Sequence, residues 1–141
     1  MPQAEGMDDE RAPPYQPMRL AGLADHIAGS LADEQRVRRL VLEFLTEYAG
    51  AEMAARQALL DPTPPPTGDP RWDAFLGALA EHLAFHDELA CPPWAQMPDR
   101  FLDRWWFLSN TPNGRAEAIV TAPASFLRRG VFIERRDLSR V

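Results

Sequence analysis

A proline-rich segment at residues 61–70 constrains the fold of this chain more than any other feature. Five of its ten residues, DPTPPPTGDP, are proline, which restricts φ and lacks a backbone N–H donor. The segment therefore cannot be helical, and we predict an extended connector over residues 61–69 between two helical parts. Asp69 and Pro70 are a favourable N-cap and first helical residue, so a helix is expected to begin there.

Residues 18–60, the N-terminal helical part, have the hydrophobic periodicity of amphipathic helices. The clearest apolar stripe follows the spacing i, i+3, i+4, i+7, i+8 and i+11 and consists of Val37, Leu40, Val41, Phe44, Leu45 and Tyr48. A shorter stripe over residues 20–27 precedes it, and the sequence SLAD between the two matches a capping box with Ser30 as N-cap. A short third helix is expected within residues 51–60.

The C-terminal part, residues 70–141, begins with a helix whose predicted apolar stripe contains Trp72, Phe75, Leu76, Leu79 and Leu83. The last third of the chain is irregular. We expect a short helix from Pro98 that carries Trp105, a helix start at Thr111, and a candidate lone short strand at residues 131–134. Alternating strand patterns and internal repeats are absent from the sequence. These features predict a mainly α class, a small helical domain with an irregular C-terminal third.

Charge and composition exclude several classes of protein. All 15 basic residues are arginine, which excludes the lysine-dependent chemistry of Schiff-base enzymes, phosphate-binding loops and kinases. Residues 1–70 hold six arginines against twelve acidic residues, a poor balance for non-specific DNA binding. The last fourteen residues, 128–141, are by contrast basic.

The sequence also predicts where the protein resides. Residues 1–17 are acidic and proline-rich, which is typical of a disordered tail and unlike a signal peptide. The chain lacks an apolar run of about 18 residues, so no membrane span is expected. The only cysteine, Cys91, cannot form an internal disulfide, which fits a reducing compartment. We therefore expect a cytoplasmic protein.

His82 and His86 are candidate metal ligands because residues four apart lie on one face of a helix. Cys91 follows five residues later and is a third candidate. The sequence lacks the HExxH pattern of metalloproteases and the Glu-x-x-His pair of di-iron bundles, and no further ligand is evident. We therefore expect no cofactor, and a small metal-dependent enzyme is the least favoured of three hypotheses.

The sequence DRFLDRWWFLSN, residues 99–110, contains two of the four tryptophans, Trp105 and Trp106. On a helix adjacent side chains point about 100° apart, so one ring is expected in the core and the other at the surface. Exposed aromatic side chains beside arginine are typical of protein interfaces. The predicted partner-binding surface consists of Arg104, Trp105, Trp106, Arg128, Arg129, Arg135 and Arg136.

Three blocks of sequence after residue 60 occur in this order in a group of known proteins: PPPTGDPRWDAFLGALAEHLAFH, PPWAQMPDRFLDRWWF and AIVTAPASFLRRGVFIERRDLSRV. They resemble small actinobacterial proteins of unassigned activity, in some of which a similar segment follows an Xre-type helix-turn-helix domain. Some of these proteins look like antitoxin or regulatory partners encoded beside nucleotidyltransferase-like proteins. The resemblance implies a protein partner, encoded in the same operon, and offers no catalytic residue.

A DNA-binding transcriptional regulator is the second hypothesis, because the first two predicted helices meet at a short turn, as in a helix-turn-helix. Glu43 and Glu47 on the second helix would meet repulsion from DNA phosphates. Residues 18–60 also lack the pattern of an Xre domain. We therefore favour a non-enzymatic, protein-binding regulatory or antitoxin-like component.

Overall fold

The computed structural model describes residues 16–109, 111–134 and 138, so most of the predicted N-terminal tail lies outside the described residues. The described chain is mainly α-helical. Its helices are α2 (Leu20–Ala28), α3 (Glu34–Gly50), α4 (Met53–Leu60), α5 (Pro70–His86), α6 (Pro112–Thr121) and α7 (Ala124–Leu127). Its short elements are the 3-10 helices η1 (Pro93–Gln96) and η2 (Pro98–Arg100) and the strands β1 (Trp106–Phe107) and β2 (Val131–Phe132).

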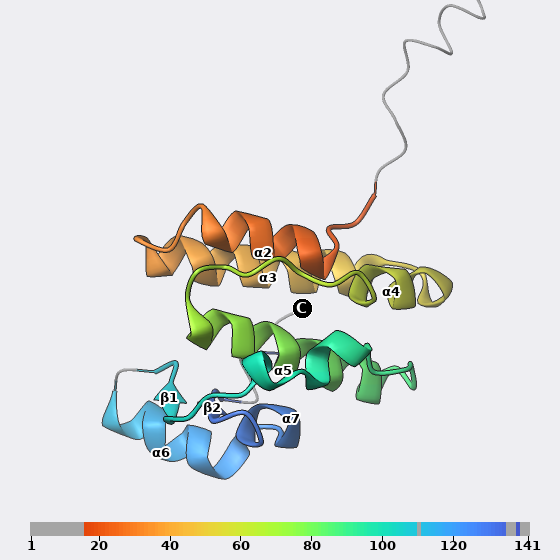
Figure 1. Cartoon of the computed structure of the whole chain (residues 1–141). Coiled ribbons are helices and arrows are strands. Elements are labelled where there is room, and N and C mark those ends of the chain that lie inside the picture. Colours follow the sequence, from red (N-terminus) through yellow and green to blue (C-terminus); the bar gives the residue numbers. More distant parts are fainter. Residues whose placement is uncertain (1–15, 110, 135–137, 139–141) are drawn as a thin grey trace, which may run out of the picture.

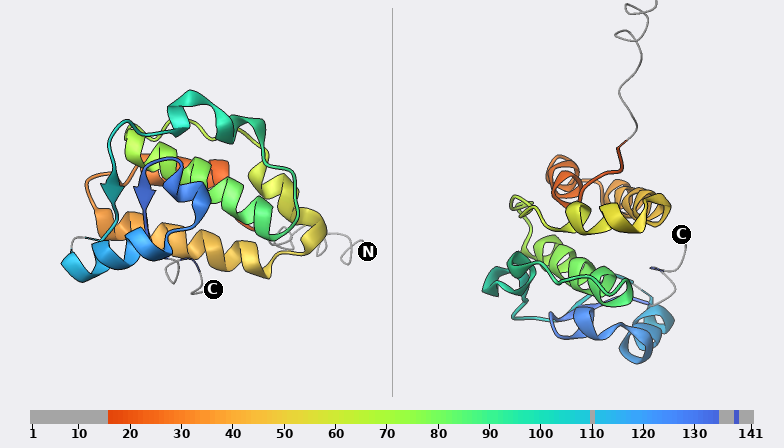
Figure 2. Two further views of the ribbon diagram at one scale, coloured as in Figure 1. Left: turned by 90° about the horizontal axis from the view of Figure 1, so that it is seen from below. Right: turned by 90° about the vertical axis from the view of Figure 1, so that its right-hand side faces the viewer.

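The helix α5 is the centre of the structure. It contacts α2 on one side and η1, η2, α7 and β2 on its other sides. Figure 1 shows α2, α3 and α4 above α5, and α6, α7 and the two strands below it. The right-hand view of Figure 2 shows the same order from the side. Residues 61–69 contain no helix and lead from the end of α4 to the start of α5.

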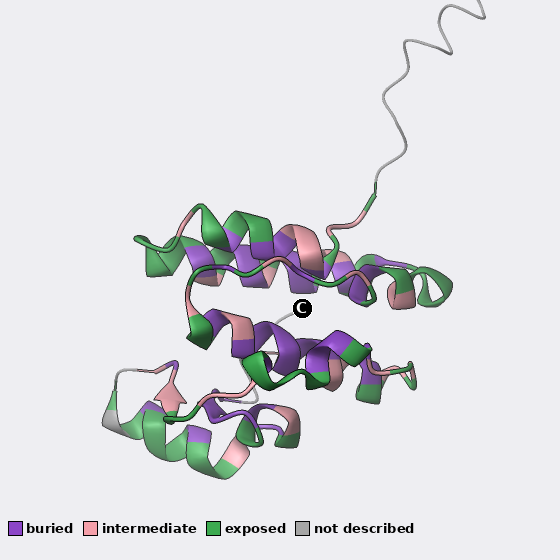
Figure 3. Ribbon diagram, viewed as in Figure 1, coloured by how far each residue is buried: buried purple, intermediate pink, exposed green. Residues whose placement is uncertain are grey.

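The predicted apolar stripes form the core between these layers. The inner faces of the helices are buried and their outer faces are exposed (Figure 3). All six predicted stripe residues of α3 are buried, namely Val37, Leu40, Val41, Phe44, Leu45 and Tyr48. On α5, Trp72 and Phe75 are also buried and meet edge to face, with ring centroids 5.2 Å apart.

The predicted start of α5 is confirmed, whereas that of α3 is wrong. The Asp69 carboxylate accepts a hydrogen bond from the Arg71 backbone N–H at 2.9 Å. In α3 the N-cap is Asp33, whose carboxylate accepts from the Arg36 backbone N–H at 3.1 Å. The predicted cap, Ser30, lies in the turn after α2, where its backbone N–H donates to the previous helix. Its hydroxyl instead accepts from the Arg36 guanidinium.

The helix predicted around Trp105 is absent, because Pro98 begins only the 3-10 turn η2 and the chain is extended again from Phe101. Trp106 and Phe107 form β1 instead. This strand pairs in parallel with β2, so the strand predicted within residues 131–134 has a partner in the same chain. The pairing joins segments that lie far apart in the sequence, so no local sequence pattern predicts it.

Gly77, in the middle of α5, allows two arginines to approach the helix closely. A Cβ atom at this position would lie 2.9 Å from Cβ of Arg100 and 3.2 Å from Nε of Arg129. Glycine inside a helix costs about 1 kcal/mol relative to alanine. The close packing of the arginines therefore outweighs helix propensity here.

We expect the Gly77→Ala variant to lower the free energy of unfolding by about 1–3 kcal/mol, since the added methyl group overpacks the site. Gly50→Ala is the matched control, because a Cβ at Gly50 meets nothing within 4 Å. It should leave the free energy of unfolding unchanged or raise it by up to about 1 kcal/mol. Urea denaturation measures both, and equal stability of Gly77→Ala and wild type would contradict the close approach.

Candidate functional site

The two adjacent tryptophans point to opposite sides of the extended segment that leads into β1. Trp106 faces inward, where its ring lies edge-on to Trp72 with centroids 5.0 Å apart, and the Arg71 guanidinium covers it at 5.1 Å. Trp105 is 73% exposed. One inward and one outward ring were expected, but the cause is the alternation of side chains along extended backbone and not helical geometry.

Trp105 packs on Phe132, which is itself stacked on a second phenylalanine. Its ring centroid lies 5.2 Å from that of Phe132, and Phe132 in turn stacks on Phe107 at 4.6 Å with an interplanar angle of 23°. Trp105 and Phe107 share one side of the extended segment because they are two residues apart. We call Trp105, Phe107 and Phe132 together the aromatic face.

Arginine and aliphatic side chains flank the aromatic face. The guanidinium of Arg115, on α6, lies 5.6 Å from the centroid of the Phe107 ring. Ile119 follows one helical turn later on the same side of α6 and is 54% exposed. Arg104 precedes Trp105 and is also exposed. This mixture of rigid aromatic rings and arginine is the chemistry found at the energetic centres of protein interfaces.

Arg129 does not belong to this surface, because its side chain is fully buried. Its Nη1 donates to Glu81 Oε1 at 2.5 Å and to the Ser125 carbonyl at 2.9 Å. Its Nη2 donates to the Ala95 carbonyl at 2.7 Å, and the guanidinium lies 4.6 Å from the centroid of the Phe101 ring. The prediction that Arg129 contacts a partner is therefore corrected: it is a structural cation.

The remaining basic residues of the predicted surface differ from one another. Arg128 is half exposed, donates to the second oxygen of Glu81 at 2.7 Å, and donates to the side-chain oxygen Oε1 of Gln96 at 3.1 Å. Arg128 therefore lies at the surface, but its guanidinium is already bound to two side chains of this chain. Arg135 and Arg136 lie outside the described residues.

Glu81 is the anion shared by both arginines, and its pKa is lowered from the ordinary value of 4.5. Burial alone would raise this pKa. The hydrogen bond and the charge of Arg129 lower it, and so do the hydrogen bond of Gln96 and the charge of Arg128. Glu81 therefore stays ionised, and its two oxygens connect α5 to the end of α7.

Arg100 is a second buried cation that sequence analysis missed, with only 4% of its surface exposed. Its Nη2 donates to the Pro64 carbonyl at 3.1 Å, and its Nη1 to the Asp73 carbonyl at 3.3 Å. The guanidinium also lies 4.8 Å from the centroid of the Trp94 ring. Arg100 thus fastens the proline-rich connector to α5. The four residues on either side of Arg100 include both acidic and basic ones, so no pattern in the nearby sequence distinguishes it from a surface arginine.

The two histidines lie together, as their spacing predicts. The ring centroids of His82 and His86 are 4.3 Å apart, and His82 also meets the edge of the Phe126 ring at 5.9 Å. Cys91 is half-buried and lies 3.4 Å from the amide nitrogen of Gln96. Within the described part of the chain, no three His, Cys, Asp or Glu residues are grouped closely enough to hold a metal ion.

Tyr48, Asp87 and Arg56 form a further cluster of titratable groups, between α3, α4 and the end of α5. The Tyr48 hydroxyl donates to Asp87 Oδ2 at 2.6 Å, and Arg56 pairs with the same oxygen at 3.0 Å. Burial and the Asp87 hydrogen bond raise the pKa of Tyr48 above its ordinary value. Tyr48 therefore keeps its proton at neutral pH, and the cluster fastens the ends of helices.

These features define the class of protein as a small, mainly α-helical domain with a two-stranded parallel sheet and an exposed aromatic face. Comparison with known proteins finds no matching family model, no matching curated protein and no matching solved structure. In residues 16–109 and 111–134, no helix combines the length and apolar character needed to cross a membrane.

We expect Glu81→Gln to lower the free energy of unfolding at pH 7 by about 3–5 kcal/mol, because Arg129 would remain buried without its counter-charge. The pKa of Glu81 in the folded protein is lower than its ordinary value of 4.5. Its contribution to the free energy of unfolding is therefore fully present above pH 4.5, and it is lost as the pH falls through the pKa of the folded state. The stability difference between wild type and variant should therefore shrink in acid.

Urea denaturation of both proteins between pH 7 and pH 3 measures this prediction. Glu43→Gln, an exposed glutamate on α3, is the matched control and should change stability by less than about 0.5 kcal/mol. A Glu81→Gln variant as stable as this control would show that Glu81 and Arg129 are not coupled.

Proposed function

We propose that this protein is a non-enzymatic, regulatory or antitoxin-like component that binds a protein partner through the aromatic face. The observation that carries the proposal is Trp105, whose ring is 73% exposed although Phe132 supports it from below. A large apolar ring in water is unfavourable for an isolated monomer, and tryptophan is among the residues most enriched at interface hot spots.

Pre-organisation supports the same function. Trp105 and Phe107 both pack on the buried Phe132 ring, so Trp105 loses little conformational freedom when a partner covers it. Phe107 and Phe132 stand on paired strands, which restricts their backbones as well. The surface therefore needs little rearrangement before binding.

The flanking charges favour a partner with acidic or carbonyl-rich character. Arg104 and Arg115 stand on either side of Phe107 in the sequence, and both are exposed. Charges at the edge of an interface mainly accelerate association and select among partners. We further propose that this partner is encoded in the same operon and that both proteins act in the cytoplasm.

Direct DNA binding receives less support from the fold. The helices α2 and α3 lie side by side and run in opposite directions in the views of Figures 1 and 2. A helix-turn-helix instead crosses its two helices at a large angle so that the second enters the major groove. The α2–α3 pair is an antiparallel helical hairpin, which lacks that geometry.

Affinity purification of the tagged chain from its native host, followed by mass spectrometry, tests the proposal. Wild type should retain one stoichiometric protein partner, and Trp105→Ala should lose it, because truncating a hot-spot tryptophan costs on the order of 2–4 kcal/mol of binding. Phe85→Ala is the matched control: Phe85 is 77% exposed but lies on α5, away from the aromatic face, so this variant should retain the partner.

Two results would contradict the proposal. The first is a wild-type protein that purifies without any partner, and the second is equal recovery of the partner by Trp105→Ala and Phe85→Ala. The ultraviolet absorbance ratio of the purified protein reports bound nucleic acid in the same experiment. Salt-dependent retention of DNA would favour the regulator hypothesis instead.

A further inference from the structure

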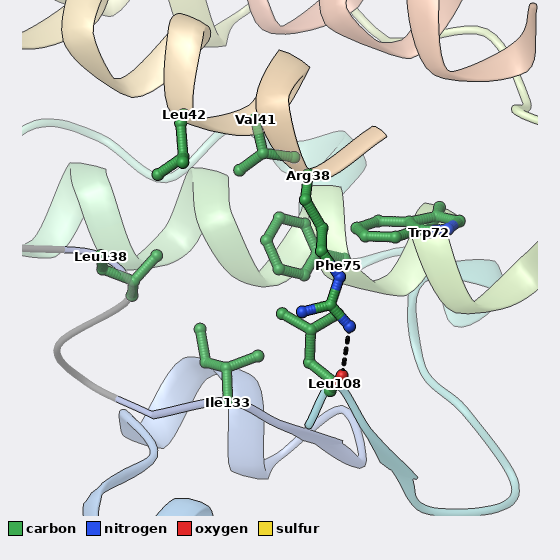
Figure 4. Close-up of a pocket in the computed structure, with 8 residues that line it drawn as sticks. All are labelled: Arg38, Val41, Leu42, Trp72, Phe75, Leu108, Ile133 and Leu138. Carbon is green, nitrogen blue, oxygen red and sulfur yellow. Dashed lines mark hydrogen bonds between the residues drawn. The ribbon is translucent and has the colours of Figure 1, made fainter. Parts of the chain in front are cut away.

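A cavity of about 240 Å³ lies between α3, α5 and the residues that follow the two strands (Figure 4). Seven of its eight lining residues have apolar side chains, and two of these are aromatic residues of α5. The lining residues are Arg38, Val41, Leu42, Trp72, Phe75, Leu108, Ile133 and Leu138. A concave apolar space with one converging charged group has the composition of a small-molecule site.

Arg38 is the one charged residue in this lining. It extends from α3 into the space between Phe75 and Leu108, and its Nη2 donates to the Leu108 carbonyl (Figure 4). The same nitrogen lies 3.5 Å from Glu34, in a half-exposed pair of little strength. Both contacts to the described residues use Nη2, so the guanidinium has further N–H donors to offer a ligand.

We propose that this cavity binds a small apolar monocarboxylate, with its carboxylate on Arg38 and its body against the rings of Trp72 and Phe75. The planar fork of arginine matches the two oxygens of a carboxylate, and the apolar walls strengthen that attraction by lowering the local dielectric constant. With a neutral apolar ligand, the half-exposed pair with Glu34 would remain the only counter-charge of Arg38 among the described residues.

The size of the cavity limits the ligand. An apolar cavity of about 150 Å³ accommodates benzene, whereas drug-sized ligands occupy roughly 300–1,000 Å³. The 240 Å³ available here therefore suits a single ring or a short alkyl chain joined to one carboxylate. Nucleotides and other large anions do not fit this volume.

The cavity is separate from the aromatic face, although the same strands contribute to both. Leu108 directly follows Phe107, and Ile133 directly follows Phe132. Successive side chains of extended backbone point to opposite sides, so the phenylalanines form the aromatic face while the next residues line the cavity. This ligand site therefore goes beyond the proposed partner binding and does not depend on it.

Titration of the full chain with phenylacetate, followed by ¹⁵N–¹H NMR, tests the proposal. The indole N–H signal of Trp72, assigned by its loss in Trp72→Phe, should shift with saturation at millimolar ligand. Phenylacetamide, a neutral ligand of the same shape, should bind at least about tenfold more weakly, which is the effect of losing one charged hydrogen bond.

Variants locate the carboxylate. Arg38→Gln should weaken phenylacetate binding about tenfold, and Arg39→Gln, an exposed arginine next to it on α3, should leave the affinity unchanged. Val41→Phe should abolish binding by filling the cavity, while its spectrum remains that of a folded protein.

Three results would overturn the proposal: no shift of the Trp72 signal, equal affinity for the acid and the amide, or unchanged binding after Val41→Phe. The comparison of acid and amide needs only the wild-type chain, so it decides the matter even if Arg38→Gln fails to fold. Partner binding through Trp105 is measured separately, so failure of one proposal is distinguishable from failure of the other.

Discussion

The buried ion pair between Arg129 and Glu81 is the interaction on which the C-terminal half of the structure depends. A fully buried guanidinium needs a counter-charge and partners for most of its donors, and here one carboxylate, two backbone carbonyls and an aromatic ring surround it. Its Nε has no hydrogen-bond partner among the described residues and lies against Gly77, where a side chain would not fit. The pair therefore ties α7 to the central helix.

This anchor determines how the next residues are arranged. The Arg129 carbonyl accepts a hydrogen bond from the Leu102 backbone N–H at 3.0 Å, and Gly130 turns the chain with a φ of +79°, a conformation that favours glycine. The Gly130 carbonyl then accepts from the Trp106 N–H at 2.8 Å. These bonds set the register of the two strands, which directs Trp106 inward and Trp105 to the surface.

Local patterns in the sequence predict the helices well. The stripe of α3, the start of α5 at Pro70 and the cap of α6 at Thr111 all depend on residues within one or two turns of each other, and the structure confirms them. The error at Ser30 has a local cause as well, because Asp33 is an equally good cap and lies closer to the first apolar residue of the stripe.

The sequence does not predict the parts that depend on distant contacts. Arg100 and Arg129 look like surface residues, because composition cannot tell an arginine with buried carbonyl partners from a solvated one. The sequence does not predict the parallel pairing of β1 with β2 either, because the two strands lie far apart in the chain. The candidate site was therefore predicted in part: Trp105 and Arg104 are exposed, whereas Arg129 is internal and Phe107, Phe132 and Arg115 were not expected.

Two surfaces with different chemistry result from this arrangement. On one side of the strands is the aromatic face, in which the exposed Trp105 ring rests on the buried Phe132, an arrangement suited to a protein partner. On the other side is the cavity beneath Arg38, which is concave and suited to a small anion. Both require the strands to stay attached to α5, and hence both require Arg129 in its buried position.

Native-state hydrogen exchange of wild type and Arg129→Met tests this dependence most directly, with Arg128→Met as the matched control. If Arg129 anchors the strands, the amides of Leu102, Trp106 and Leu108 should lose protection by about a hundredfold or more in Arg129→Met, while those of α3 keep theirs. Unchanged protection of the strand amides, or an equal loss throughout the chain, would contradict the account.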